Sequence, residues 1–257
     1  MQPPFTHRSL VVLLALLALG AGCQAPPSGP TTETEPGTPA NGASVPQSFL
    51  DSHEPTVRVA GSATVNRTTL ITRPVANGTE SETLTQTTLL RVAFERGRAF
   101  ERLDPLGGDG IVRYRTENGT TYERYAGGEL YYGPQRSQPI NESEALTPML
   151  VADSALERRG PGTVDGVSGT VYVVTSFSAL GEGVYDSVDP ETVTAFNATY
   201  VVDERGYVAY QRLRFTVERE SGTLTVTESV RTSEVGSTSV EPPAWLDEAR
   251  AQAAARE

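Results

Sequence analysis

Apolar and polar residues alternate with a period of two over most of the chain after residue 55, a pattern typical of β-strands. Turn signals such as Asn77-Gly78 and Asn118-Gly119 separate the alternating runs. The pattern predicts strands over residues 56–73, 83–95, 98–103, 111–117, 120–125, 129–132, 163–177, 196–202, 207–218 and 223–235. Turns of two to four residues join only antiparallel neighbours. The sequence therefore predicts a mainly β fold, an open antiparallel half-barrel of about nine to eleven strands in meander order.

Helix signals are fewer, and each is tied to a clear start or stop. Thr147-Pro148 is a typical helix start with proline at the first helical position, and Gly160 is a typical stop. The helix expected between them carries the apolar residues Met149 and Leu150. The predicted helices cover residues 47–53, 147–160, 189–196 and a last stretch from 244 to near the C-terminus.

Burial on one side of the sheet is the basis of the functional hypothesis. Over residues 207–218, one face is mainly apolar and the other carries Arg212, Arg214 and Glu218. A sheet of this size has more apolar surface than a few short helices can cover, so we expect a helical lid over a cavity on the concave face. The candidate lining residues are Leu213, Phe215, Val217, Met149 and Leu150. The alternative is that sheet curvature and aromatic side chains close the core completely.

The start of the chain has the pattern of an export signal. Polar, weakly basic residues lead into the uncharged apolar run 10–19, which is too short to span a membrane. Gly20-Ala21-Gly22 and then Cys23, the only cysteine, follow it. We expect a signal peptide over 1–22, lipidation of Cys23, a Thr/Pro/Gly-rich tether over 23–46 and a single domain over 47–257. An ordinary signal cut near Ala21, which would leave a free thiol, is the alternative.

Composition narrows the range of partners. The chain has 32 acidic and 21 basic residues, a net charge of -11, and every basic residue is an arginine. Nucleic-acid binding is excluded because it needs clustered cations, and an electrostatic hold on anionic lipid is disfavoured for the same reason. An acidic, lysine-free surface is what we expect of a halophilic protein, where carboxylates hold hydration in concentrated salt.

Glycosylation sequons support an extracellular location. Five of the six asparagines stand in Asn-X-Ser/Thr, where chance would give about one. The candidate acceptors are Asn66, Asn77, Asn118, Asn141 and Asn197. Asn77-Gly78 and Asn118-Gly119 also have a sufficient structural reason as turns. With Cys23, the sequons predict a membrane-anchored glycoprotein on the extracellular face.

No catalytic motif or cofactor motif is present, so we expect no enzyme, no cofactor and no metal. After the signal, His53 is the only histidine, and a catalytic triad would have to use it. The sequence Gly166-Val167-Ser168-Gly169 lacks the spacing of a nucleophile elbow and is better interpreted as a tight turn. Residues 104–110 are acidic and glycine-rich, but they lack the repeated acidic spacing of a calcium loop and are predicted to be a solvated turn.

The layout resembles the lipoprotein-carrier fold, an open half-barrel with a helical lid found in periplasmic lipoprotein carriers and in mycobacterial lipid-binding lipoproteins. It is nearest to a set of uncharacterised haloarchaeal lipoproteins. The resemblance lies in Cys23 with its tether, the hairpin Tyr200–Val208 and the closing segment Val240–Trp245, and it covers roughly residues 47–246. It implies that an acyl chain binds on the concave face. The chain departs from the carriers in its first helix, which is reduced to a few residues around Phe49.

Two functions follow from these observations. The first is a tethered module that binds lipid or another apolar ligand. The second is a structural or interaction protein of the cell envelope with a filled core and no ligand. Neither the ligand nor any protein partner can be identified from these residues.

Overall fold

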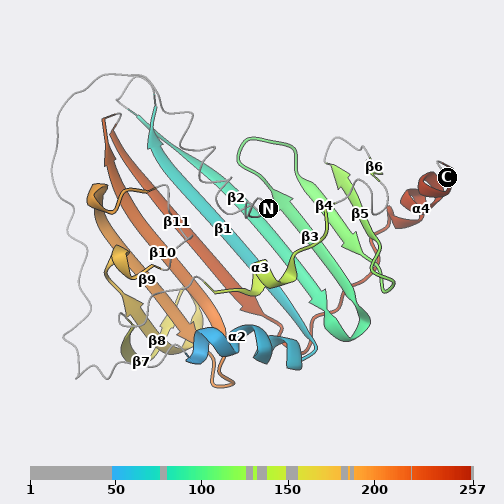
Figure 1. Cartoon of the computed structure of the whole chain (residues 1–257), viewed down its shortest axis with the longest axis horizontal. Helices are drawn as coiled ribbons and strands as arrows, with labels where there is room; N and C mark the ends of the chain where they lie inside the picture. Colours follow the sequence, from blue (N-terminus) through green and yellow to red (C-terminus); the bar gives the residue numbers. More distant parts are fainter. Residues whose placement is uncertain are drawn as a thin grey trace, which may run out of the picture.

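The chain forms one open antiparallel sheet with short helices, seen in the computed structural model of Figure 1. The structure describes residues 48–75, 80–125, 130–131, 138–148, 156–180, 185, 188–220 and 222–255. The strands are β1 (Ser62–Pro74), β2 (Ser81–Ala93), β3 (Arg98–Asp104), β4 (Ile111–Arg115), β5 (Thr121–Tyr125), β6 (Leu130–Tyr131), β7 (Glu157–Val164), β8 (Val167–Val174), β9 (Val193–Val202), β10 (Val208–Arg219) and β11 (Gly222–Ser233). The predicted fold class is confirmed.

Strand order shows two meanders that meet at the centre of the sheet. The order is β6-β5-β4-β3-β2-β1-β11-β10-β9-β8-β7, so the first and last strands are neighbours. They pair from Thr64 opposite Ser233 to Thr72 opposite Thr225. Between β6 and β7 the chain passes from one edge of the sheet to the other, and α3 (Glu142–Leu146) lies on this path (Figure 1).

One face of the sheet carries α2 (Ser48–Val59) and α3, and we call it the inner face (Figure 1). Val57 of α2 and Leu146 of α3 pack there with Val65 and Leu90 in one buried cluster. On the outer face, the chain after β11 packs on Tyr114 and leads into α4 (Leu246–Ala254). None of the described helices is long and apolar enough to span a membrane.

Helix α2 is longer than its prediction, which ended at His53, and it continues through Pro55 to Val59. Phe49, Leu50, His53 and Val57 are all buried, and their spacing places them on one side of a helix. Their burial outweighs the hydrogen bond that proline removes. The predicted strand 56–73 therefore begins later, at Ser62, after Gly61 with a φ of 86°.

The predicted helix 147–160 is wrong where the structure describes it. Residues 149–155, with Met149 and Leu150, lie outside the described residues. Residues 157–160 belong to strand β7, and the helix is α3, which ends before Thr147. Gly160 has a φ of 95° at a register shift in β7, so its left-handed conformation serves a β-bulge and not a helix end.

Two other predictions change in detail, and a third is confirmed. The predicted helix 189–196 is the single 3-10 turn η3 (Pro190–Thr192), because the residues after it form strand β9. The predicted strand 163–177 is the end of β7 and all of β8, joined by Asp165-Gly166 with φ values of 47° and 77°. This confirms the turn before Val167. The predicted C-terminal helix is confirmed as α4.

Candidate functional site

The inner face has two chemically different halves, on either side of the central β1–β11 pair. We call the inner-face side chains of β8, β9 and β10, with the nearby ends of β1 and β11, the apolar half. It consists of Tyr172, Val174, Phe196, Ala198, Tyr200, Leu213, Phe215, Val217, Leu224, Val226 and Ile71. The predicted lining residues Leu213, Phe215 and Val217 lie here and are 0%, 1% and 2% exposed. That they line a ligand cavity stays a prediction, since neither described pocket includes them.

Aromatic side chains from outside the strands cover the apolar half. Phe177, in the 3-10 turn η2 (Phe177–Ala179), has its ring 5.6 Å from the rings of Phe196 and Phe215. The ring of Tyr185 lies 4.9 Å from that of Phe215. Phe49 of α2 stacks on Tyr172 at 4.8 Å. The described part of segment 175–192 thus covers the sheet with two 3-10 turns and isolated aromatic residues.

The inner-face ion pairs of β3, β4 and β5 form what we call the charged half. The antiparallel register places Arg113 opposite both Glu101 and Glu123. Arg113 donates to Glu101 at 2.8 Å and to Glu123 at 2.6 Å, and the Glu123 side chain is only 4% exposed. Burial alone would lower the pKa of Arg113, but the hydrogen bonds and charges of the two carboxylates outweigh it, so the pKa is raised.

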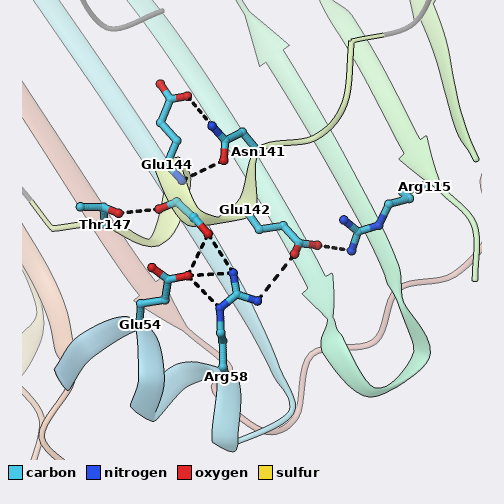
Figure 2. Close-up of polar contacts among 8 residues, drawn as sticks. Glu54, Arg58, Arg115, Asn141, Glu142, Glu144 and Thr147 are labelled. Carbon is cyan, nitrogen blue, oxygen red and sulfur yellow. Dashed lines mark hydrogen bonds and ion pairs between the residues drawn. The ribbon is translucent and has the colours of Figure 1, made fainter. Parts of the chain in front are cut away.

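Ion pairs also fasten α3 to α2 and to the sheet (Figure 2). Arg115 of β4 bonds to Glu142, and Arg58 of α2 reaches the same carboxylate at 3.9 Å. Ser143 of α3 accepts from Arg58 at 3.0 Å and donates to Glu54 at 2.9 Å. Several directional contacts therefore fix the position of this five-residue helix.

A polar pair lies between the two halves, on the central strands. Nε of Arg67, on β1, lies 3.5 Å from Oε1 of Glu228, on β11. The hydroxyl of Tyr185 donates to Glu228 at 3.2 Å. Burial, and then the charge of Glu228, raises the pKa of the nearby Tyr200. The inner face therefore carries buried charge next to its apolar half.

His53 has a structural role. It is 3% exposed on α2, and its Nδ1 accepts the backbone N–H of Val208 at 3.0 Å. Because Nδ1 accepts, the neutral imidazole carries its proton on Nε2. Burial lowers the pKa of His53 to about 4, although the charge of Glu54 opposes the shift. A cavity of about 10 Å³, the size of one water, lies beside this histidine, Gln211 and Thr232.

The larger described pocket lies on the outer face and was not predicted. It has a volume of about 290 Å³ between strands β3–β5 and the chain that leads into α4. Its lining includes Tyr114, Tyr122, Arg98, Arg250 and Asn118. Because its walls come from segments more than 100 residues apart, local sequence patterns give no signal for it.

Three of the four described sequon asparagines take part in local hydrogen bonds. Asn141 accepts the Glu144 N–H at 3.2 Å and so caps α3 (Figure 2). The side-chain oxygen of Asn118 accepts from Thr120 N–H at 3.2 Å within a turn, and that of Asn197 accepts from Thr199 at 3.1 Å. Asn66 is exposed on the outer face of β1. Cys23 and Asn77 lie outside the described residues.

No metal site is found within the described ranges, where no three His, Cys, Asp or Glu side chains are close enough to hold an ion. The acidic turn 104–110 agrees with this, since Asp104 bonds to Arg102 at 3.0 Å and Thr87 at 3.1 Å. Residues 107–109 of this turn are exposed. The turn is solvated, as predicted.

Together these features define a class, namely open antiparallel β-sheet proteins of half-barrel-like form with short helices on the inner face. The chain belongs to the family described as "Family of unknown function (DUF7537)", whose sequence model matches residues 8–249. No curated protein matches it significantly. Among matching solved structures is a DUF1329 family protein from Desulfovibrio piger, at 10% identity, over 80% of this chain and 98% of that one, with a TM-score of 0.26. At that TM-score the likeness says nothing of function.

Proposed function

We propose that this chain is an exported lipoprotein, anchored to the outer face of a cytoplasmic membrane through Cys23, that binds a lipid or other apolar ligand on its inner face. The proposal of ligand binding is supported by the way in which the apolar half is covered. The rings of Phe177, in the 3-10 turn η2, and of Tyr185, which belongs to no strand, lie on Phe215. Rings held by such contacts separate from a sheet at lower cost than a hydrogen-bonded strand does. Their movement away from Phe215 would expose a continuous apolar surface to a ligand.

The anchor is supported by the residues at the start of the chain. The apolar run 10–19 and the small residues before Cys23 fit export and lipidation, and the tether 23–46 would hold the domain away from the membrane. The acidic composition and the sequons fit an extracellular, halophilic glycoprotein. We propose no catalytic activity for it, because its sequence carries no catalytic motif. We expect Cys23→Ser to release the chain from the membrane fraction, with Ser28→Ala as control. Retention of Cys23→Ser would contradict the anchor.

Native mass spectrometry of the full chain, purified from its own cells, tests ligand binding. We expect a co-purifying apolar mass, and after delipidation we expect uptake of diphenylhexatriene, an uncharged apolar fluorophore. The outcome that contradicts the proposal is a chain with no bound mass and no fluorophore uptake.

A variant of the cover sharpens this test. Tyr185→Phe keeps the ring on Phe215 but removes the hydroxyl that bonds Glu228. Since one hydrogen bond contributes about 1 kcal/mol, we expect fluorophore uptake about fivefold faster. Tyr210→Phe, which removes a hydroxyl that bonds Asp165 on the outer face, is the matched control and should leave the rate unchanged. Equal rates for both variants would show that this segment is not the entrance.

A second candidate function is an envelope structural or interaction protein without a ligand. The near-complete burial of Leu213, Phe215 and Val217 favours it, because these side chains already pack against protein. Crosslinking in cells separates the two functions. If the chain is a structural or interaction protein, crosslinking should capture a protein partner on an intact chain that carries no ligand. If it is a ligand-binding protein, the bound apolar mass should be found instead.

A further inference from the structure

Arg67 has a buried nitrogen with nothing to bond to. Among the residues that the structure describes, its Nη2 is the one buried side-chain nitrogen or oxygen without a hydrogen-bond partner. Its other contact is weak, since Nε lies 3.5 Å from Glu228. Leaving a buried donor unpaired is unfavourable, and more so when the donor is charged. Such a group calls for a partner from outside the protein chain.

Arg67 lies where the polar end of an amphiphile would meet the apolar half. It is at the centre of the inner face, with Thr88 on β2 and Val230 on β11 as register partners. The same cross-strand row runs through Gln211 to Tyr200 and Tyr172. At the usual strand spacing this row reaches about 19 Å from β1 to β8, which is room for a long hydrocarbon chain.

The charges near Arg67 favour an uncharged ligand head group over an anionic one. Glu228 already balances the positive charge of Arg67. The ion pairs of the charged half and of the helices fastened to it set four carboxylates against three guanidinium groups, namely Glu54, Glu101, Glu123 and Glu142 against Arg58, Arg113 and Arg115. The whole chain carries a net charge of -11. An anionic head group would meet this excess of negative charge, whereas an uncharged oxygen would accept from Nη2 without repulsion.

Resting on the proposed function, we propose that Arg67 binds the polar head of an uncharged amphiphile through a hydroxyl, ester or ether oxygen that accepts from Nη2. The hydrocarbon part lies on the apolar half, and a head-group hydroxyl donates to Glu228. Tyr185, which bonds Glu228 in the closed structure, leaves that carboxylate when the ligand enters.

The test compares two amphiphiles with the same hydrocarbon chain, monoolein and oleate, on the delipidated full chain by native mass spectrometry and fluorophore displacement. We expect monoolein to bind about tenfold more tightly than oleate. Arg67→Lys keeps a positive charge beside Glu228 but removes Nη2, so it should lose that preference while still binding diphenylhexatriene. Arg212→Lys, an outer-face arginine paired with Asp165 at 3.4 Å, is the matched control.

The outcomes separate this inference from the function on which it rests. If diphenylhexatriene binds but oleate binds as tightly as monoolein, or Arg67→Lys retains the preference, Arg67 holds only a buried water and the inference is overturned. If neither the fluorophore nor either amphiphile binds, ligand binding itself is wrong. Loss of the preference in Arg67→Lys alone, with an unchanged unfolding midpoint, supports the assignment.

Discussion

Leu213 and Arg113 both point to the inner face, on opposite sides of the β1–β11 pair, and they are held in different ways. Leu213 is completely buried among apolar side chains, while Arg113 is fixed by two carboxylates at 2.8 Å and 2.6 Å. Apolar burial has no preferred direction and tolerates sliding and repacking. Ion pairs are directional. The comparison indicates that the side chains covering the apolar half can be exchanged for a ligand. The ion pairs of the charged half, by contrast, fix α3 in place.

The largest effect is expected from Phe215→Ala in the apolar half. Phe215 is 1% exposed, and the rings of Phe177 and Tyr185 lie against it. Removing a buried phenylalanine should lower the free energy of unfolding by about 3–5 kcal/mol, measured by denaturant titration. Thr216→Ala, on the other face of the same strand, should cost under about 1 kcal/mol. A cost near 1 kcal/mol for Phe215→Ala would show that this half is loosely packed.

Arg113→Met should cost less, about 2–3 kcal/mol at pH 7. The substitution leaves Glu101 and Glu123 facing each other without a cation, but these residues keep some contact with solvent. Glu101→Gln in the Arg113→Met background removes one of the two facing charges, so it should recover part of the deficit. Denaturant titrations measure both variants, with the exposed Arg102→Met as control. No recovery would mean that packing, and not charge, is what Arg113 contributes.

His53 should make the stability of the fold depend on pH. Its pKa is lowered to about 4 in the folded chain, from an ordinary value of 6.5, so the unfolded chain binds more protons between these values. Stability from this group is therefore complete above pH 6.5 and is lost as the pH falls towards 4, by about 2 kcal/mol at pH 5. His53→Asn keeps an acceptor for the Val208 N–H and should remove that part of the acid sensitivity. Parallel pH curves for both proteins would refute this role.

The smallest effect is expected in α3. Asn141→Ala removes the cap on the Glu144 N–H, which should cost about 1 kcal/mol locally. Amide exchange at Ala145 and Thr147 should become about fivefold faster, because their N–H groups bond within this helix. The exposed Asn66→Ala is the control. Unchanged exchange would show that the ion pairs of Glu142 and the hydrogen bonds of Ser143, and not the cap, hold α3.

Local patterns predicted what depends on neighbours in sequence. The alternation of β10 predicted its buried face, and Gln211, Leu213, Phe215 and Val217 are buried as expected. The prediction failed at Gly160. Glycine in the left-handed conformation occurs both at helix ends and at β-bulges, so the residue type alone does not distinguish the two. They also missed the β1–β11 pair, since a contact across more than 150 residues has no local signal.

The candidate site was only partly predictable for the same reason. Residues 66–69 are all polar, so the local pattern gives no sign that a nitrogen of Arg67 is buried. Arg67 stands two residues after Val65 and four before Ile71. Because side chains alternate along a strand, this spacing does place Arg67 on the inner face with them. Its unpaired nitrogen depends on the packing of β2 and β11, and only the structure shows that.

Photo-crosslinking tests the location of the ligand most directly. The full chain would be loaded with a monoacylglycerol that carries a diazirine at the end of its hydrocarbon chain, irradiated, digested and mapped by mass spectrometry. We expect label on peptides of β8 to β10, above all those with Tyr172, Leu213 and Phe215. Label confined to the outer-face pocket beside Tyr114 and Tyr122, or no specific label, would contradict binding on the inner face.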